Sequence, residues 1–345
     1  MAGQRITGVS QDQMRFGRAE RLLQRPAYMV AVEQVVDALD PSAPPAVASF
    51  AGGKRLASAR RIGLFAGSYN PLTSAHVALA DAAHEQAQLD DIVWAISRVT
   101  VDKERVTRAC VADRLAQLVA FARPRRETVA LVNRGLYVDQ VRALRAAVRL
   151  DARVLVLLGY DKVVQIFDPH YYTDREAALS ALFADADLLV APRDAFGAND
   201  IAALLARPEN HRYASHVKAL TLPSEHLHDS STAARQLAAE PARNRAALER
   251  LVPPEALALI ATRAYSPSND YTLRQQWLAA LAVLSDPQLR RVPPLLQLTV
   301  AIQRLPDGEA NLRAAAIQPN AQATIKLLRA AAHHDAEGGS PTPQR

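Results

Sequence analysis

Six short apolar runs recur through the middle of the chain, at residues 62–66, 92–96, 128–132, 154–158, 188–191 and 217–222. Between most of them lie stretches with apolar residues at helical spacing, at 76–88, 111–122, 138–149 and 176–183. Short strands that alternate with longer helices indicate βαβ units. Runs without polar alternation are typical of a parallel sheet buried on both faces. We therefore expect a doubly wound, mostly parallel α/β domain over residues 58–265.

The flanking segments lack this alternation. Residues 1–57 contain an amphipathic stretch and then a breaker cluster at 40–45, which predicts a helical or irregular N-terminal extension. A linker at 266–269 begins a region with helical spacing, so we expect a helical C-terminal extension over 266–336. Residues 337–345 are expected to be a disordered tail.

Cysteine content and charge narrow the function classes. Cys110 is the only cysteine among 345 residues, which excludes an intrachain disulfide and a Cys-rich zinc site. The N-terminus lacks the apolar core of a signal peptide, and no apolar run approaches the length of a membrane span, so we expect a cytoplasmic protein without a membrane partner. The net charge of +6 comes from scattered basic residues without a dense run. This favours a small polyphosphate over a nucleic acid.

The most specific motif follows the first apolar run. It reads Gly67-Ser-Tyr-Asn-Pro, with Thr73 and His76 at the start of the next helical stretch. Glycine allows a tight turn and close backbone approach, and a helix start offers N–H groups and a positive dipole end to phosphate. Thr73 and His76 are three residues apart, hence on one helical face, and both are candidate hydrogen-bond donors to phosphate oxygens. An ordinary strand–turn–helix connection is the alternative for a single Gly-rich turn.

A second motif, Asp229-Ser-Ser-Thr-Ala-Ala-Arg235, precedes another helical pattern. Its hydroxyls can cap a helix or bind phosphate, and an arginine one turn further on can grip phosphate oxygens with its planar fork. Taken alone, a helix cap followed by a surface arginine explains it as well. A third motif places Gly159 and Asp161 at the end of the fourth run, where a carboxylate can accept hydrogen bonds from ribose or cap a helix.

Together these motifs resemble those of the nucleotidylyltransferase superfamily, and most closely those of nicotinamide/nicotinate mononucleotide adenylyltransferases. The first motif matches the signature Gly-(Ser/Thr)-(Phe/Tyr)-(Asn/Asp)-Pro-x-(His/Thr)-x-x-His. The second matches Ile-Ser-Ser-Thr-x-x-Arg, except that Asp229 replaces an apolar residue. The resemblance implies a Rossmann-like fold and a catalytic role for His76, Thr73 and Arg235. It also implies nucleotide or phosphate contacts from Gly67, Ser68, Tyr69, Asn70, Gly159, Asp161, Arg193, Ser230, Ser231 and Thr232.

The resemblance also suggests residues for the acceptor. Relatives place a lysine in the loop after the second strand, which makes Lys103 a candidate. Where relatives carry a tryptophan after Gly-x-Asp, this chain has Tyr171 and Tyr172, and Tyr172 is the second candidate. Arg114 is expected to be a surface or salt-bridge residue. His226 and His228 are expected to lie in a loop without a metal, because no convincing third ligand accompanies them.

The activity implied is transfer of AMP from ATP to nicotinamide or nicotinate mononucleotide, with release of pyrophosphate, in NAD biosynthesis. Mg²⁺ is expected to bind through the nucleotide phosphates, without a protein metal site. Two alternatives stay open: a nucleotidylyltransferase that uses another phosphate acceptor or CTP, and a non-catalytic nucleotide-binding regulator on the same fold. A homo-oligomer is also possible.

Overall fold

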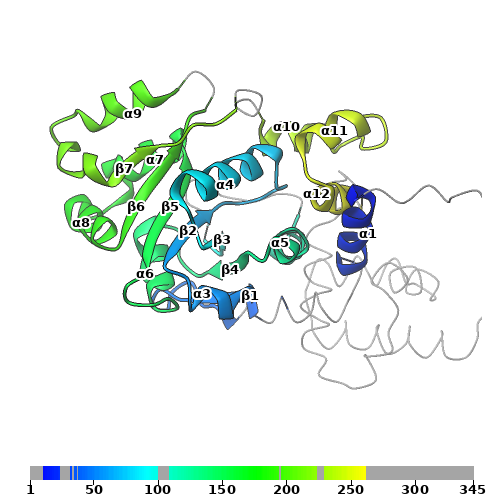
Figure 1. Ribbon diagram of the computed structural model, residues 1–345, viewed down its shortest axis with the longest axis horizontal. Coiled ribbons are helices and arrows are strands. Elements are labelled where there is room, and N and C mark those ends of the chain that lie inside the picture. The colour runs from blue at the N-terminus through cyan, green and yellow to red at the C-terminus, as the bar shows by residue number, and fades with distance from the viewer. Residues whose placement is uncertain are drawn as a thin grey trace, which may run out of the picture.

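The computed structural model describes residues 11–23, 32, 35–36, 38–99, 109–193, 196–223 and 229–261. Seven strands form one sheet in the order β1-β4-β3-β2-β5-β6-β7 (Figure 1). Strands β2 to β7 pair in parallel, and β1 pairs antiparallel with β4. The predicted mostly parallel, doubly wound sheet is confirmed. The strands are β1 Val47–Ala51, β2 Arg61–Ala66, β3 Asp91–Ser97, β4 Thr128–Val132, β5 Arg153–Gly159, β6 Ala186–Ala191 and β7 Val217–Ala219.

Helices cover both faces of this sheet, because side chains alternate along each buried strand. On β3, Trp94 packs into the cluster beneath α4 and α5, whereas Val93 and Ala95 belong to the cluster on the opposite face. The helices α6, α7 and α8 cover that opposite face. The main helices are α4 Ser74–Ala87, α5 Val111–Arg125, α6 Tyr137–Arg145, α7 Tyr160–Phe167, α8 Arg175–Asp185, α9 Ala198–Leu205, α10 Ser231–Leu237, α11 Arg245–Leu251 and α12 Pro254–Leu259.

The edge strand β1 lies within the segment expected to be an irregular extension. Asn133, fully buried at the end of β4, fastens the chain just before it. Its Nδ2 donates to the carbonyls of Asp40 at 2.8 Å and Pro44 at 3.0 Å, and its Oδ1 accepts from the N–H of Ala46 at 2.8 Å. One asparagine thus satisfies backbone groups of a proline-rich segment that has no regular structure to do so. Residues 47–51 are therefore part of the sheet.

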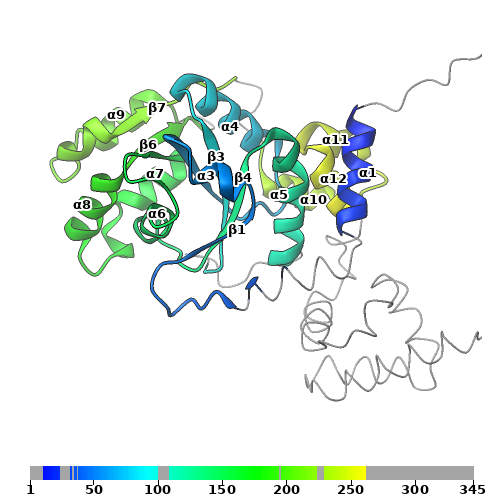
Figure 2. The same ribbon diagram turned by 60° about the horizontal axis from the view of Figure 1, so that its bottom comes forward.

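The N-terminal helix α1, Gln11–Leu23, packs beside α12 and α5 (Figure 2). Arg15 donates from Nε and Nη2 to the two carboxylate oxygens of Glu255, at 2.9 and 3.0 Å. The Glu255 side chain is only 2% exposed, so this two-pronged ion pair neutralises a buried charge. Distant parts of the chain thereby meet on one side of the domain.

None of the described helices combines the length and apolarity needed to cross a bilayer. The helical extension and tail expected over residues 266–345 lie outside the described residues.

Candidate functional site

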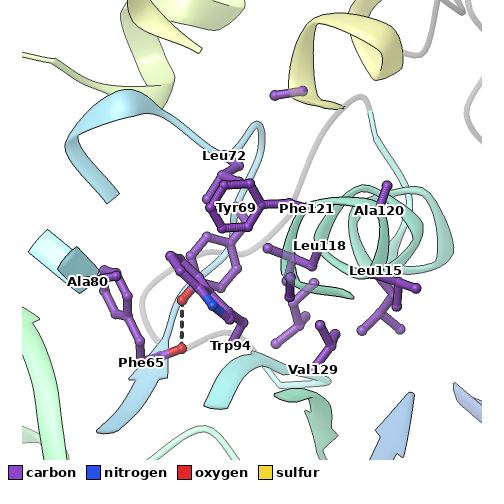
Figure 3. Packing of buried hydrophobic residues seen from close by; sticks show 14 of the residues in the cluster. Phe65, Tyr69, Leu72, Ala80, Trp94, Leu115, Leu118, Ala120, Phe121 and Val129 are labelled. Carbon is purple, nitrogen blue, oxygen red and sulfur yellow. Dashed lines mark hydrogen bonds between the residues drawn. The ribbon is translucent and has the colours of Figure 1, made fainter. Parts of the chain in front are cut away.

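The β2–α4 loop, residues 67–73, takes its shape from Tyr69. This residue, rather than Gly67, has the left-handed backbone conformation, with φ of 44°. Its side chain is 1% exposed, and its hydroxyl donates to the carbonyl of Phe65 at 2.6 Å. The ring also packs edge-on against Phe65 and Trp94 (Figure 3). Tyr69 therefore anchors the loop in the core, and its contact with the nucleotide stays a prediction.

The next helix begins with a reciprocal cap between Thr73 and His76. The N–H of Thr73 donates to Nδ1 of His76 at 3.1 Å, and the Thr73 hydroxyl lies 2.6 Å from the same nitrogen. Thr73 is fully buried and caps the helix from outside it. Thr73 therefore orients the imidazole, and the contact of its hydroxyl with phosphate stays a prediction.

The same cap fixes the protonation of His76. A nitrogen that accepts a backbone N–H carries no proton, so Nε2 carries the proton of the neutral ring. Burial, and secondarily the positive charge of Arg193, lower the pKa of His76 to about 4. At neutral pH, His76 is thus an uncharged hydrogen-bond donor through Nε2.

Helix α10 fastens the second motif to the first. Arg235 donates from Nη1 to the carbonyl of Asn70 at 2.7 Å, and the Ser231 hydroxyl donates to the carbonyl of Pro71 at 2.9 Å. Arg235 also donates from Nη2 to the Thr232 hydroxyl at 2.9 Å. Ser230 caps α10 by accepting from the N–H of Ala233 at 3.1 Å. Ser231 and Arg235 therefore both hold the β2–α4 loop, and through them the second motif is joined to the first.

Helix α5 fastens the loop from the other side, through two residues that the sequence did not single out for this role. Arg114 donates from Nη1 to the carbonyl of Ser68 at 2.7 Å, and Gln117 donates from Nε2 to the carbonyl of Tyr69 at 3.1 Å. Arg114 is only 2% exposed, so the expectation of a surface arginine is wrong. The signal available in the sequence was a pair of polar residues, three apart, on a helix with many apolar residues.

These elements enclose a cavity of about 350 Å³ at the carboxyl ends of β2, β5 and β6. Because β2 has β3 on one side and β5 on the other, the cavity lies where the winding of the sheet reverses, the usual ligand position in such folds. Every residue assigned from the sequence to catalysis or to nucleotide and phosphate contact lines it: Gly67, Ser68, Tyr69, Asn70, Thr73, His76, Gly159, Asp161, Arg193, Ser230, Ser231, Thr232 and Arg235.

Asp161 and Arg193 form an ion pair at this cavity. Arg193 Nε lies 3.3 Å from Asp161 Oδ2, and both side chains are roughly half exposed. Asp161 lies in the first turn of α7, whose N-cap is Gly159. An ion pair as exposed as this contributes little stability, so a ligand can compete for either partner at low cost.

A second cavity of about 110 Å³ adjoins the first, and Ala66, Gly67, Ser68, Tyr137 and Lys162 line both. Tyr171, Tyr172 and Arg114 also line it. The Tyr172 hydroxyl donates to the carbonyl of Ile166 at 2.9 Å, and burial raises its pKa to about 12. Lys162, which directly follows Asp161, and Tyr137 were not predicted. Lys103 lies outside the described residues.

Cys110 is not among the described residues that line either cavity. Cys110 is buried and caps α5, its sulfur accepting from the N–H of Asp113 at 3.4 Å. His226 and His228 lie outside the described residues. Across the part of the chain that the structure describes, no three or more His, Cys, Asp or Glu side chains gather as a metal site would require.

Comparison with known proteins gives one family match. Residues 64–235 match the cytidylyltransferase-like family model. No curated protein matches the chain significantly. Among solved structures, the chain resembles Plasmodium falciparum nicotinic acid mononucleotide adenylyltransferase complexed with NaAD, at 16% identity and a TM-score of 0.45, over 59% of this chain and 96% of that one.

Two further structures are similar at a lower score. The same Plasmodium falciparum protein complexed with APC has 16% identity and a TM-score of 0.43, with the same coverage of 59% and 96%. Thermotoga maritima TmcAL bound with alpha-thio ATP has 12% identity and a TM-score of 0.33, over 78% of this chain and 70% of that one. Resemblances this weak do not indicate a substrate.

Proposed function

Residues 64–235 belong to the cytidylyltransferase-like family of nucleotidylyltransferases, and on this premise we propose that the protein transfers AMP from ATP to nicotinamide or nicotinate mononucleotide, releasing pyrophosphate. The observation that carries the proposal is the junction of the two phosphate motifs. Arg235 reaches the carbonyl of Asn70 and Ser231 that of Pro71, so both motifs line one cavity. That cavity presents hydrogen-bond donors to an anionic ligand from two helices at once.

The chemistry needs no nucleophilic side chain. An oxygen of the acceptor phosphate attacks the α-phosphorus of the nucleotide, a new P–O bond forms, and the bond from that phosphorus to the bridging oxygen breaks. Pyrophosphate leaves with the electron pair. Because the acceptor is already an anion, the protein contributes positioning and charge stabilisation.

The donors for the phosphates are His76, Thr232 and Arg235. Neutral His76 offers Nε2–H without first losing or gaining a proton, since its pKa lies near 4. The Arg235 guanidinium adds positive charge beside the Thr232 hydroxyl. These groups would stabilise negative charge as it moves toward the leaving pyrophosphate.

The nucleoside end of the ligand would meet Asp161 and Arg193. Ribose hydroxyls can donate to the Asp161 carboxylate, replacing its exposed contact with Arg193. Arg193 would then be released toward a phosphate or a base edge. Gly159 leaves this approach open, since a Cβ built on it would meet nothing within 4 Å.

In this cavity, Mg²⁺ would bind to the nucleotide more than to protein side chains. Among the described lining residues the carboxylates are Asp161 and Asp229, and Asp161 is paired with Arg193. Mg²⁺ would therefore be held mainly by the phosphates, and it would supply charge neutralisation on the leaving pyrophosphate.

The acceptor would occupy the second cavity, which opens beside the same loop. Its described lining carries the cations Arg114 and Lys162 together with Tyr137, Tyr171 and Tyr172. Tyrosine rings suit a planar ring, and the cations suit the negative charge of a phosphate-bearing acceptor. Lys103 stays a proposed acceptor contact.

The decisive test is pyrophosphate release by the purified protein with Mg²⁺, crossing ATP and CTP with phosphate acceptors that include both pyridine mononucleotides. Release that requires ATP and a pyridine mononucleotide supports the proposal, and its loss in His76→Ala links it to this cavity. Release only with another pair would keep the reaction type and change the substrates. Nucleotide binding without release from any pair would favour a non-catalytic nucleotide-binding protein.

A further inference from the structure

Gln117 lies in the middle of α5, fully buried, and is not among the described residues that line either cavity. Its amide nevertheless holds the β2–α4 loop at two points. Nε2 donates to the carbonyl of Tyr69 at 3.1 Å, and Oε1 accepts from the N–H of Leu72 at 3.2 Å. A donor is needed at one point and an acceptor at the other, which only one orientation of the amide provides.

Arg114 acts on the same loop from one turn earlier on α5. Residues three apart share a helix face, so both side chains reach toward the loop. Arg114 donates to the carbonyl of Ser68 at 2.7 Å. With the bonds from α10, the carbonyls of four consecutive residues, Ser68 to Pro71, each accept a side-chain hydrogen bond.

A buried amide at this place needs an explanation. The neighbouring α5 residues Leu115, Leu118 and Phe121 are buried apolar side chains of the same core cluster. An apolar residue of similar size would fill the space without the cost of removing an amide from water. The amide recovers that cost only through its two bonds to the loop, so what it adds is control of the loop conformation.

We propose that Gln117 is a positioning residue for the reaction: it holds the loop carbonyls in the orientation that accepts a triphosphate, without touching the substrate. Carbonyl oxygens carry partial negative charge and repel phosphate oxygens. Their hydrogen bonds to α5 and α10 already hold these carbonyls once the protein has folded. The cost of avoiding the repulsion is therefore met before the reaction begins. The catalytic part of this inference rests on the proposed function.

The first test compares Gln117→Met with Arg145→Met. Arg145, on α6, likewise donates to two backbone carbonyls, those of Ala152 at 2.7 Å and Leu150 at 2.9 Å, but lines neither cavity. In Gln117→Met we expect faster hydrogen exchange of the β2–α4 loop, weaker ATP binding, and a kcat/KM for ATP lower on the order of tenfold. In Arg145→Met, loop exchange and kcat/KM should stay within about twofold of wild type at equal folded fraction.

The second test uses Gln117→Glu and a pH series. A protonated carboxyl supplies one donor and one acceptor, as the amide does, whereas an ionised one supplies acceptors only. Relative to wild type, kcat/KM of Gln117→Glu should therefore recover as the pH is lowered, whereas Gln117→Met should show no recovery. A residue that only fills space would give no such difference. Gln117→Glu also keeps the test usable if Gln117→Met does not fold.

Wild-type loop exchange and wild-type kcat/KM in both Gln117 variants would overturn the inference. Absence of nucleotidyl transfer by the wild-type protein would instead overturn the proposed function. In that case loop exchange alone still decides whether Gln117 fixes the loop.

Discussion

The ring of Tyr69 lies in tight contact with the position at which a side chain on residue 67 would begin. A Cβ built on Gly67 would lie 3.0 Å from Cζ and 3.1 Å from Cε1 of that ring. The glycine is therefore needed for the close approach of an anchored ring, while the left-handed backbone falls on Tyr69 itself.

Gly67→Ala should consequently be destabilising. The added methyl group must displace a ring that is held by its bond to the carbonyl of Phe65. We expect the free energy of unfolding to fall by roughly 1–3 kcal/mol, as for other overpacked sites. Nucleotidyl transfer should fall as well, since the loop follows the ring.

The matched control is Gly159→Ala, because a Cβ there meets nothing within 4 Å and the backbone is extended. Its unfolding free energy should change by less than about 1 kcal/mol. Urea unfolding of the two variants checks the comparison. Equal stability of Gly67→Ala and wild type would show that the ring is not fixed.

The pairing of His76 with Thr73 predicts unequal effects of two substitutions. His76→Ala removes a donor proposed to face the phosphates and should lower turnover on the order of a hundredfold or more. Thr73→Val keeps the backbone N–H that bonds Nδ1 and loses only the buried hydroxyl. Thr73→Val should therefore lose less turnover than His76→Ala, and the turnover of Thr73→Ser should be close to that of wild type. Steady-state kinetics decide the order, and a fully active His76→Ala would contradict it.

The depressed pKa of His76 predicts a titration far from the ordinary range. Burial holds the pKa near 4 in the folded protein, against 6.5 for a free imidazole. The stability linked to this group is thus present above pH 6.5 and is lost as the pH falls toward 4. NMR of the ring nitrogens should show protonated Nε2 at neutral pH. Bound ATP should raise the pKa, because negative phosphates favour the imidazolium. Ordinary titration near 6.5 in the free protein would refute the assignment.

Asp91 makes a separate prediction about stability. It is 2% exposed, its two oxygens accept from the N–H and the hydroxyl of Thr128, and burial raises its pKa to about 6. Because the pKa of Asp91 is raised in the folded protein, its contribution to the free energy of unfolding is fully present below pH 3.8, its pKa in the unfolded chain. This contribution is lost as the pH rises through 6. An asparagine can keep both contacts without ionising.

The unfolding free energy of Asp91→Asn minus that of wild type should therefore increase from pH 4 to pH 7, by roughly 2–3 kcal/mol. Urea unfolding at both pH values provides the measurement. A difference that does not change with pH would mean that Asp91 ionises normally in the folded protein.

The elements predicted best are those whose pattern is local. Strands such as β3 and β5 are uninterrupted apolar runs because both of their faces are covered, and this shows in the sequence itself. Strand β1 was not predicted, because its residues, Val47–Ala51, are small or mixed in polarity and follow a proline-rich segment. Its pairing depends on β4 and on Asn133, which lie far along the chain.

The same distinction between local sequence patterns and long-range contacts applies to the candidate site. The motif residues that line the cavity were predicted because their motifs are contiguous and resemble those of a known family, whereas Tyr137 and Lys162, which lie outside these motifs or were not assigned from them, were missed. The individual roles of the residues at this site were not predicted, because those roles depend on contacts between helices. The burial of Thr73, the inward position of Arg114 and the loop contacts of Gln117 follow from how α4, α5 and the loop pack together.

The bonds from Arg235 to Asn70 and from Ser231 to Pro71 span 165 and 160 residues. At a synthesis rate of about 5–20 residues per second, the loop leaves the ribosome on the order of 10–30 s before the residues that complete it. A growing chain can therefore build its first strands while it still lacks Ser231 and Arg235, whose side chains hold the β2–α4 loop. The cavity that both motifs line is therefore complete only in chains that have been translated past α10.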